Sequence, residues 1–136
     1  MTLDEVLTKY PEAATFKFGD GPDLSALLLR LVREGRKTAT CGALRDYESG
    51  QEEMPAVGRK DIALEWDGQP ALVIETVELN QTRFCDVEAE FALAEGENET
   101  LEGWRRDHRA YFERNGGWDP EMILVCERFR MVEDFG

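Results

Sequence analysis

The segment LSALLLRLVREGRKTAT (residues 24–40) contains a helical pattern, a glycine that can end a helix, and a short segment typical of a β-strand. After Pro22, the leucines at positions 24, 27, 28 and 31 follow the spacing i, i+3, i+4 and i+7, which predicts an amphipathic helix. Gly35 is the residue type that ends such helices. The sequence therefore places a helix directly before Arg36, and a new element begins there.

Residues 36–41 favour a β-strand because they contain Thr38 and Thr40. Lys37 and Thr40 are three positions apart, so they would point to opposite faces of a regular strand. The two side chains can act together only if the backbone bends between them, through a bulge or a helical turn. We therefore expect this segment not to be a straight strand.

The segments on either side follow from local patterns. A capping box, Thr2-x-x-Glu5, predicts a short helix that ends before Pro11. Residues 15–22 are expected to form a loop or short strand, and residues 43–57 a loop with room for one helical turn. The alternating segments 61–66 and 71–79 flank Asp67-Gly68, which predicts an antiparallel hairpin.

The C-terminal part continues the mixture. Asp86 is expected to cap a helix from Val87 to about Ala94, and a second helix runs from near Thr100 to the glycines at 116–117. Residues 122–132 read as a long strand. Together the elements predict an α+β fold in which a mostly antiparallel sheet or small barrel is flanked by helices.

Composition narrows the class of protein. With 136 residues, 42% of them apolar and 33% charged, one globular domain over residues 1–136 is expected. The start MTLDEVLTKY has no pattern of a signal peptide and no run is long enough to cross a membrane, so we expect a cytoplasmic protein without a membrane partner. Cys41, Cys85 and Cys126 show no paired spacing, and His108 is the only histidine, so neither a metal nor a cofactor is predicted.

The net charge of −13 restricts the kinds of binding partner that the protein is expected to have. Proteins that grip long nucleic acids usually present a basic surface, because neutralising phosphates supplies most of the affinity. We therefore expect no DNA partner. A small nucleoside fits this charge best, and a short RNA in a local basic pocket is the alternative.

Several motifs occur in one order along the chain. Gly35-x-Lys37-x-x-Thr40 is followed by Val57-Gly58, VIET (73–76), AEGE (94–97) with a tryptophan and a histidine behind it, and LVCERFRMV (124–132). Over about residues 16–132, the chain resembles the ASCH domain family, which is related to the PUA RNA-binding fold. The resemblance implies a PUA-like small β-barrel of mostly antiparallel strands flanked by helices, preceded here by the short N-terminal helix.

The resemblance also implies an activity. One branch of the family looks like amidohydrolases that remove an acyl group from the exocyclic amine of N4-acylated cytidine, such as 4-acetylcytidine. Their catalytic lysine, threonine and glutamate match Lys37, Thr40 and Glu97, the last through Glu-Asn-x-Thr-Leu at residues 97–101. Short members carry an arginine two residues after the threonine, where this chain has Gly42, and the nearest arginine is Arg45.

The three residues suit amide hydrolysis. A threonine hydroxyl needs a base to take its proton, and a neutral lysine can serve, as it does in serine–lysine pairs. Glu97 would either hold Lys37 or protonate the leaving amine. An ionised Glu97 favours the charged lysine and a protonated one avoids this, so both roles stay open. Without the resemblance, Lys37 and Glu97 would be read as solvated charges and Thr40 as an ordinary strand residue.

Five further residues are candidates for substrate binding. Tyr47 and Trp104 could stack on a base, although Trp104 also has the spacing of a core residue. His108 lies on the same helical stripe and fits a core or a pocket. Arg45 and Glu48 follow the motif and could contact a base edge or a ribose.

Three functions are ranked on these grounds. An amidohydrolase acting on acylated cytidine nucleosides comes first. A ribonuclease comes second and needs a basic cleft, for which the sequence offers Arg36, Lys37, Arg45, Arg105 and Arg106. An RNA-binding regulator without chemistry is third, and the negative charge counts against both RNA options.

Overall fold

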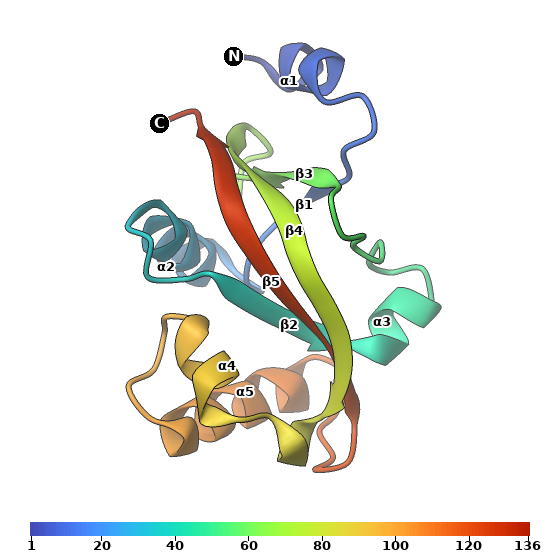
Figure 1. Cartoon of the computed structure of the whole chain (residues 1–136), viewed down its shortest axis with the longest axis vertical. Helices are drawn as coiled ribbons and strands as arrows, with labels where there is room; N and C mark the ends of the chain where they lie inside the picture. Colours follow the sequence, from blue (N-terminus) through green and yellow to red (C-terminus); the bar gives the residue numbers. More distant parts are fainter.

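The computed structural model describes all 136 residues as five α-helices around a five-stranded sheet (Figure 1). The helices are α1 (Leu3–Lys9), α2 (Pro22–Arg33), α3 (Leu44–Glu48), α4 (Ala89–Ala94) and α5 (Leu101–Arg114), and a short 3-10 helix, η1, covers Phe84–Asp86. The strands are β1 (Thr15–Phe16), β2 (Ala39–Ala43), β3 (Lys60–Leu64), β4 (Pro70–Arg83) and β5 (Ile123–Asp134). None of the helices is both long and apolar enough to cross a bilayer.

The sheet has the strand order β1-β3-β4-β5-β2. Strand β1 pairs with β3 in parallel, and all other neighbours are antiparallel. The predicted α+β class with a mostly antiparallel sheet is confirmed. The sheet is not closed into a barrel, because β1 and β2 are its two edges and do not pair with each other. Strand β1 is only two residues long.

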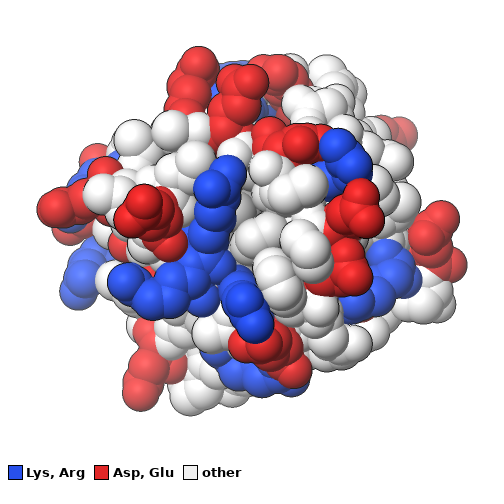
Figure 2. Space-filling model, turned by 90° about the horizontal axis from the view of Figure 1, so that it is seen from below, with Lys and Arg blue, Asp and Glu red and all other residues white.

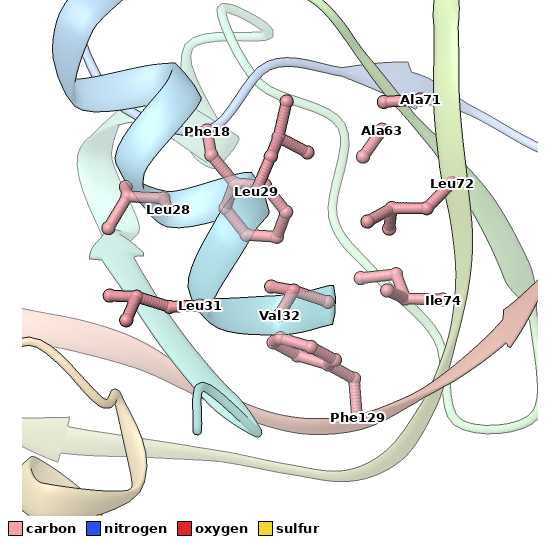
Figure 3. Packing of buried hydrophobic residues seen from close by; sticks show 10 residues of the cluster. All are labelled: Phe18, Leu28, Leu29, Leu31, Val32, Ala63, Ala71, Leu72, Ile74 and Phe129. Atoms are coloured by element: carbon pink, nitrogen blue, oxygen red, sulfur yellow. The ribbon is translucent and has the colours of Figure 1, made fainter. Parts of the chain in front are cut away.

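Helix α2 covers one part of the sheet, as Figure 3 shows. Its apolar side packs into a cluster with Phe18 and with residues of β3, β4 and β5. The predicted helix after Pro22 is confirmed, with proline in its first turn. Burying each large aliphatic side chain is worth roughly 1.5–3 kcal/mol, so this packing holds the helix against the sheet. The cluster consists of Phe18, Leu28, Leu29, Leu31, Val32, Ala63, Ala71, Leu72, Ile74 and Phe129.

The predicted hairpin is present as β3 and β4, joined by a turn in which Gly68 has a φ of 92°. Strand β4 continues past residue 79 to Arg83 because β5 pairs with it along its length, from Leu72↔Asp134 to Arg83↔Ile123. Strands β4 and β5 form a long two-stranded ribbon in Figure 1, and β2 pairs with the other edge of β5. The predicted helical turn after residue 43 is α3.

A second cluster lies between α5 and the ribbon, with Phe84, Trp104, Phe112 and Leu124 among its buried members. The expected cap of α4 is wrong, because Asp86 lies in η1 and accepts a hydrogen bond from Arg83 Nε at 2.8 Å. Helix α4 begins two residues later than expected, at Ala89. The capping box of α1 is confirmed.

Candidate functional site

The site begins at the C-terminal end of α2. The N–H of Gly35 donates to Val32 O at 3.0 Å, and the N–H of Arg36 donates to Leu31 O at 2.9 Å. These two bonds form a Schellman motif, and Gly35 has the positive φ of 76° that it needs. The chain then runs irregularly to Ala39, where β2 starts. The predicted bend is confirmed, since Lys37 precedes the strand and Thr40 lies in it.

A second glycine brings a distant loop onto this segment. Gly96 has a φ of 81°, and a Cβ at this position would lie 2.5 Å from Arg36 O. The N–H of Thr38 donates to Ala94 O at 2.8 Å, which ties the two backbones together. Because Gly96 has no side chain, its two glutamate neighbours can both reach Lys37.

Lys37 is buried, with 2% of its surface exposed. Its Nζ lies 3.3 Å from Glu95 Oε1, 3.5 Å from Glu97 Oε2 and 3.4 Å from the backbone oxygen of Glu95. A buried ammonium group is costly unless it is paired, and two carboxylates supply that pairing. Its polar partners are therefore the glutamates and not Thr40.

Glu95 is the central carboxylate of the site, and sequence reasoning assigned it no role. It is buried, and Trp104 Nε1 donates to its Oε2 at 2.8 Å. Burial alone would raise the pKa of Glu95, but the charges and hydrogen bonds of Lys37, His108 and Trp104 outweigh it and lower that pKa to about 2. The motif AEGE contains both Glu95 and Glu97, and the sequence does not distinguish the buried glutamate from the other.

His108 closes the network from α5. Its Nδ1 lies 2.9 Å from Trp104 O, and its Nε2 lies 3.5 Å from Glu95 Oε1. Burial lowers the pKa of His108, but its hydrogen bond to the Glu95 carboxylate and the charges of Glu95 and Glu97 raise that pKa above its ordinary value. Lys37 and His108 thus both lie against the Glu95 carboxylate.

A cavity of about 450 Å³ adjoins this network and lies where the sheet is open. Residues 14–16, at β1, and residues 40–43, in β2, both line it, so the two edges face one space. Its volume is in the range of small-molecule sites. Lys37, Thr40, Glu97, Tyr47 and His108 all line it, so the structure brings these predicted residues together.

Glu127 is a further cavity residue that the sequence did not single out. It pairs with Thr40 across β2 and β5, so the two side chains lie on the same face of the sheet. Thr76 Oγ1 donates to Glu127 Oε2 at 2.6 Å. Burial raises the pKa of Glu127 despite this bond. Only the long-range strand register could have revealed its position.

Three predicted binding residues do not line the cavity. Trp104 is fully buried in the second cluster, where it stacks on His108 and holds Glu95. Arg45 points to the end of α5 and donates to Gly117 O at 2.6 Å, and Glu48 is exposed. We correct these assignments. Trp104 orients the site and cannot stack on a ligand.

The departure at Gly42 has a steric explanation. A Cβ there would lie 2.7 Å from Tyr47 Oη and 3.1 Å from a ring carbon of Tyr47. The tyrosine therefore occupies the space over β2 that a longer side chain at position 42 would need. Burial also raises the pKa of Tyr47, so its hydroxyl stays neutral and can donate into the cavity.

A family model described as the ASCH domain matches residues 14–133. The chain belongs to the ASCH domain family. This ASCH domain resembles the crystal structure of one from Lactobacillus crispatus JV V101, with a TM-score of 0.82 and 30% identity over 95% of this chain and 85% of that one. It resembles a protein from Enterococcus faecalis V583 equally well, with a TM-score of 0.82 and 32% identity over 96% and 85% of the two chains.

A more distant structure shares only the fold with this ASCH domain. That of an ASCH protein mutant from Zymomonas mobilis has a TM-score of 0.52 at 10% identity, over 87% of this chain and 67% of that one. No protein of curated function matches the sequence.

Proposed function

We propose that this ASCH domain is an amidohydrolase that removes the acyl group from the exocyclic amine of N4-acylated cytidine nucleosides, of the 4-acetylcytidine type. The observation that carries the proposal is Lys37. A lysine that is buried, paired with two carboxylates and exposed only towards a cavity it shares with a threonine has the environment of a reactive group.

Thr40 is the nucleophile in this proposal. Its hydroxyl attacks the carbonyl carbon of the amide, and the neutral form of Lys37 takes the hydroxyl proton. Lys37 reaches that form by passing a proton to Glu97 Oε2, which lies 3.5 Å away and is the more exposed of its two partners. Glu95 remains ionised, because its pKa lies at about 2, and holds the lysine in position.

The amide bond then breaks. Glu97 delivers its proton to the departing N4 of cytidine, which leaves as a neutral amine, and the acyl group stays on Thr40 as an ester. Water hydrolyses this ester and releases the carboxylic acid, and the threonine regains its proton. Each proton is accounted for by Lys37, Glu97 or water.

The charge of the cavity supports an uncharged substrate. Eight of its lining residues are Asp or Glu, against two lysines, one arginine and one histidine. The arginine, Arg114, is held by Asp20 at 2.6 Å, and Lys37 is paired as described. A neutral nucleoside is indifferent to this field, whereas a phosphodiester is repelled by it.

The ribonuclease alternative needs basic groups near Lys37. Of the arginines proposed for such a cleft, Arg36, Arg45, Arg105 and Arg106 do not line the cavity. Figure 2 shows basic side chains gathered at the end of the molecule with α4 and α5, with acidic side chains interspersed among them. The interspersed acidic side chains disfavour the binding of a polyanion to this surface.

The test is a direct assay of hydrolysis. Purified protein is incubated with 4-acetylcytidine, and conversion to cytidine is followed by its ultraviolet spectrum. The proposal expects turnover that Thr40→Ala abolishes and Thr38→Ala leaves intact, since Thr38 is the exposed threonine of the same motif. Single-stranded RNA that is cleaved by the wild type and not by Lys37→Ala would favour the ribonuclease instead.

A further inference from the structure

Three side chains with metal-binding atoms meet at the wall of the cavity, although they come from distant parts of the chain. Cys41 lies in β2, Glu95 in the loop after α4 and His108 in α5. The thiol sulfur, a carboxylate oxygen and an imidazole nitrogen all lie within 4.8 Å of one another. Their spacing in the sequence matches no metal motif, so the sequence alone predicted no metal. We propose that they form a binding site for a soft divalent cation of the Zn²⁺ class.

The donor set suits that ion. Zn²⁺ prefers thiolate, imidazole and carboxylate ligands at roughly 2.0–2.3 Å in a tetrahedron, which brings the ligand atoms of neighbouring residues to the separations seen here with small side-chain movements. Mg²⁺ and Ca²⁺ favour sites made of oxygen ligands, and the thiol and imidazole count against them. The chemistry of the three residues thus selects the class of cation.

The orientation of His108 is that of a metal-binding imidazole. A backbone carbonyl only accepts hydrogen bonds, so the contact of Nδ1 with Trp104 O requires the proton to be on Nδ1. In the neutral ring, Nε2 then carries a lone pair, and it points at Glu95 Oε1 at 3.5 Å. A lone pair facing a carboxylate is unfavourable unless a proton or a cation lies between them. A proton on Nε2 takes this place in the metal-free protein, and a metal ion that displaces the proton would satisfy both atoms.

Hydrogen bonds with Trp104 already orient two of the proposed metal ligands. Trp104 fixes two of the ligands, with its backbone oxygen on His108 Nδ1 and its indole Nε1 on Glu95 Oε2 at 2.8 Å. Hydrogen bonds of this kind orient metal ligands and set the imidazole tautomer. Trp104 itself is fully buried and rigidly packed. The ligands therefore need little reorganisation to bind.

Binding of the divalent cation leaves the formal charge of the surrounding network unchanged. Zn²⁺ would replace two protons, one on the Cys41 thiol and one on His108, so the formal charge of the network would not change. Lys37 keeps Glu97 and the backbone oxygen of Glu95 as partners when the Glu95 carboxylate turns to the metal. Because all three ligands line the cavity, the fourth coordination position opens into it.

The experiment uses reduced, metal-free protein and Co²⁺ as a spectroscopic substitute for Zn²⁺. One equivalent of Co²⁺ should produce the near-ultraviolet charge-transfer band of a cobalt–thiolate bond, and one equivalent of Zn²⁺ should remove it. Cys41→Ser should abolish the band. Cys85→Ser, which changes the exposed cysteine, should leave it intact.

A second variant separates ligand loss from misfolding. His108→Gln keeps the thiol and should lower Zn²⁺ affinity at least tenfold in calorimetry, with both variants shown to be folded by circular dichroism. The proposal is overturned if wild-type protein gives no thiolate band, or if the band survives Cys41→Ser. These readouts do not depend on hydrolytic activity, so the metal site and the proposed function can fail separately.

Discussion

At the scale of single residues, the site depends on a balance of buried charges. Lys37 and His108 face Glu95 and Glu97 in a region with little water. Such a network is stable only when each charge has a partner, because an unpaired buried charge costs several kcal/mol. Glu95 is the most connected residue of the network, because its carboxylate contacts Lys37, His108 and Trp104.

Glu95→Gln tests this balance through stability. The folded-state pKa of Glu95, about 2, is below its ordinary value of 4.5, so its contribution is present above pH 4.5 and is lost as the pH falls towards 2. We expect the variant to be less stable by about 3 kcal/mol at pH 7. The difference from wild type should shrink below pH 4.5.

Urea unfolding of both proteins at several pH values between 7 and 3 measures this difference. Glu99→Gln, at an exposed position of the same loop, controls for the general effect of removing a charge and should change stability by less than about 0.5 kcal/mol. An equal loss for Glu95→Gln at every pH would contradict the assigned role of its charge.

At the scale of elements, two close backbone approaches build the site. The Schellman end of α2 places Lys37, and Gly96 lets the loop between α4 and α5 lie against it. The first of these was predictable, because helix periodicity and Gly35 are local signals. The second was not, since it requires residues 36 and 96 to meet through the tertiary fold.

Gly96→Ala tests the second approach. A Cβ would clash with Arg36 O at 2.5 Å, and the φ of 81° adds backbone strain. We expect a loss of about 2–4 kcal/mol of stability. Gly58→Ala is the matched control, because Gly58 has a φ of 87° but no atom within 4 Å of the added Cβ, and it should lose about 1 kcal/mol. Chemical denaturation of the two variants compares them, and equal losses would mean that the loop contact is unimportant.

The difference between local and long-range signals also explains which other elements and residues could be predicted from the sequence. The β3–β4 hairpin and the capping box of α1 came from short patterns and are present. The sequence offered Trp104 as either a core or a stacking residue, because a helical stripe cannot show whether a residue faces a core or a pocket, and the core position is confirmed. Glu127 and Cys41 gain their positions from strand register, which no local pattern records.

At the scale of the whole molecule, the open sheet and the acidic charge act together. The cavity lies where β1 and β2 fail to meet, and carboxylates dominate its lining. The net charge of −13 extends the same field beyond it. The open position in the sheet and the acidic lining therefore belong to the same cavity.

This field predicts discrimination between nucleoside and nucleotide. If N4-acetylcytidine is hydrolysed, its 5′-monophosphate should show kcat/KM at least tenfold lower, a difference of about 1.4 kcal/mol. The difference should narrow as salt screens the carboxylates. Steady-state kinetics of both substrates at low and high salt measure this. Equal kcat/KM values at low salt would show that the cavity charge does not select the substrate.

One assay of cytidine release tests whether Lys37 and Thr40 hydrolyse the N4-acyl group. Protein at high concentration is incubated with 4-acetylcytidine, and cytidine is quantified for wild type, Lys37→Met and Lys9→Met, the last at an exposed lysine of α1. We predict turnover by wild type and Lys9→Met, with a loss of at least 1,000-fold, about 4 kcal/mol, for Lys37→Met. No cytidine from wild type, or undiminished turnover by folded Lys37→Met, would contradict this mechanism.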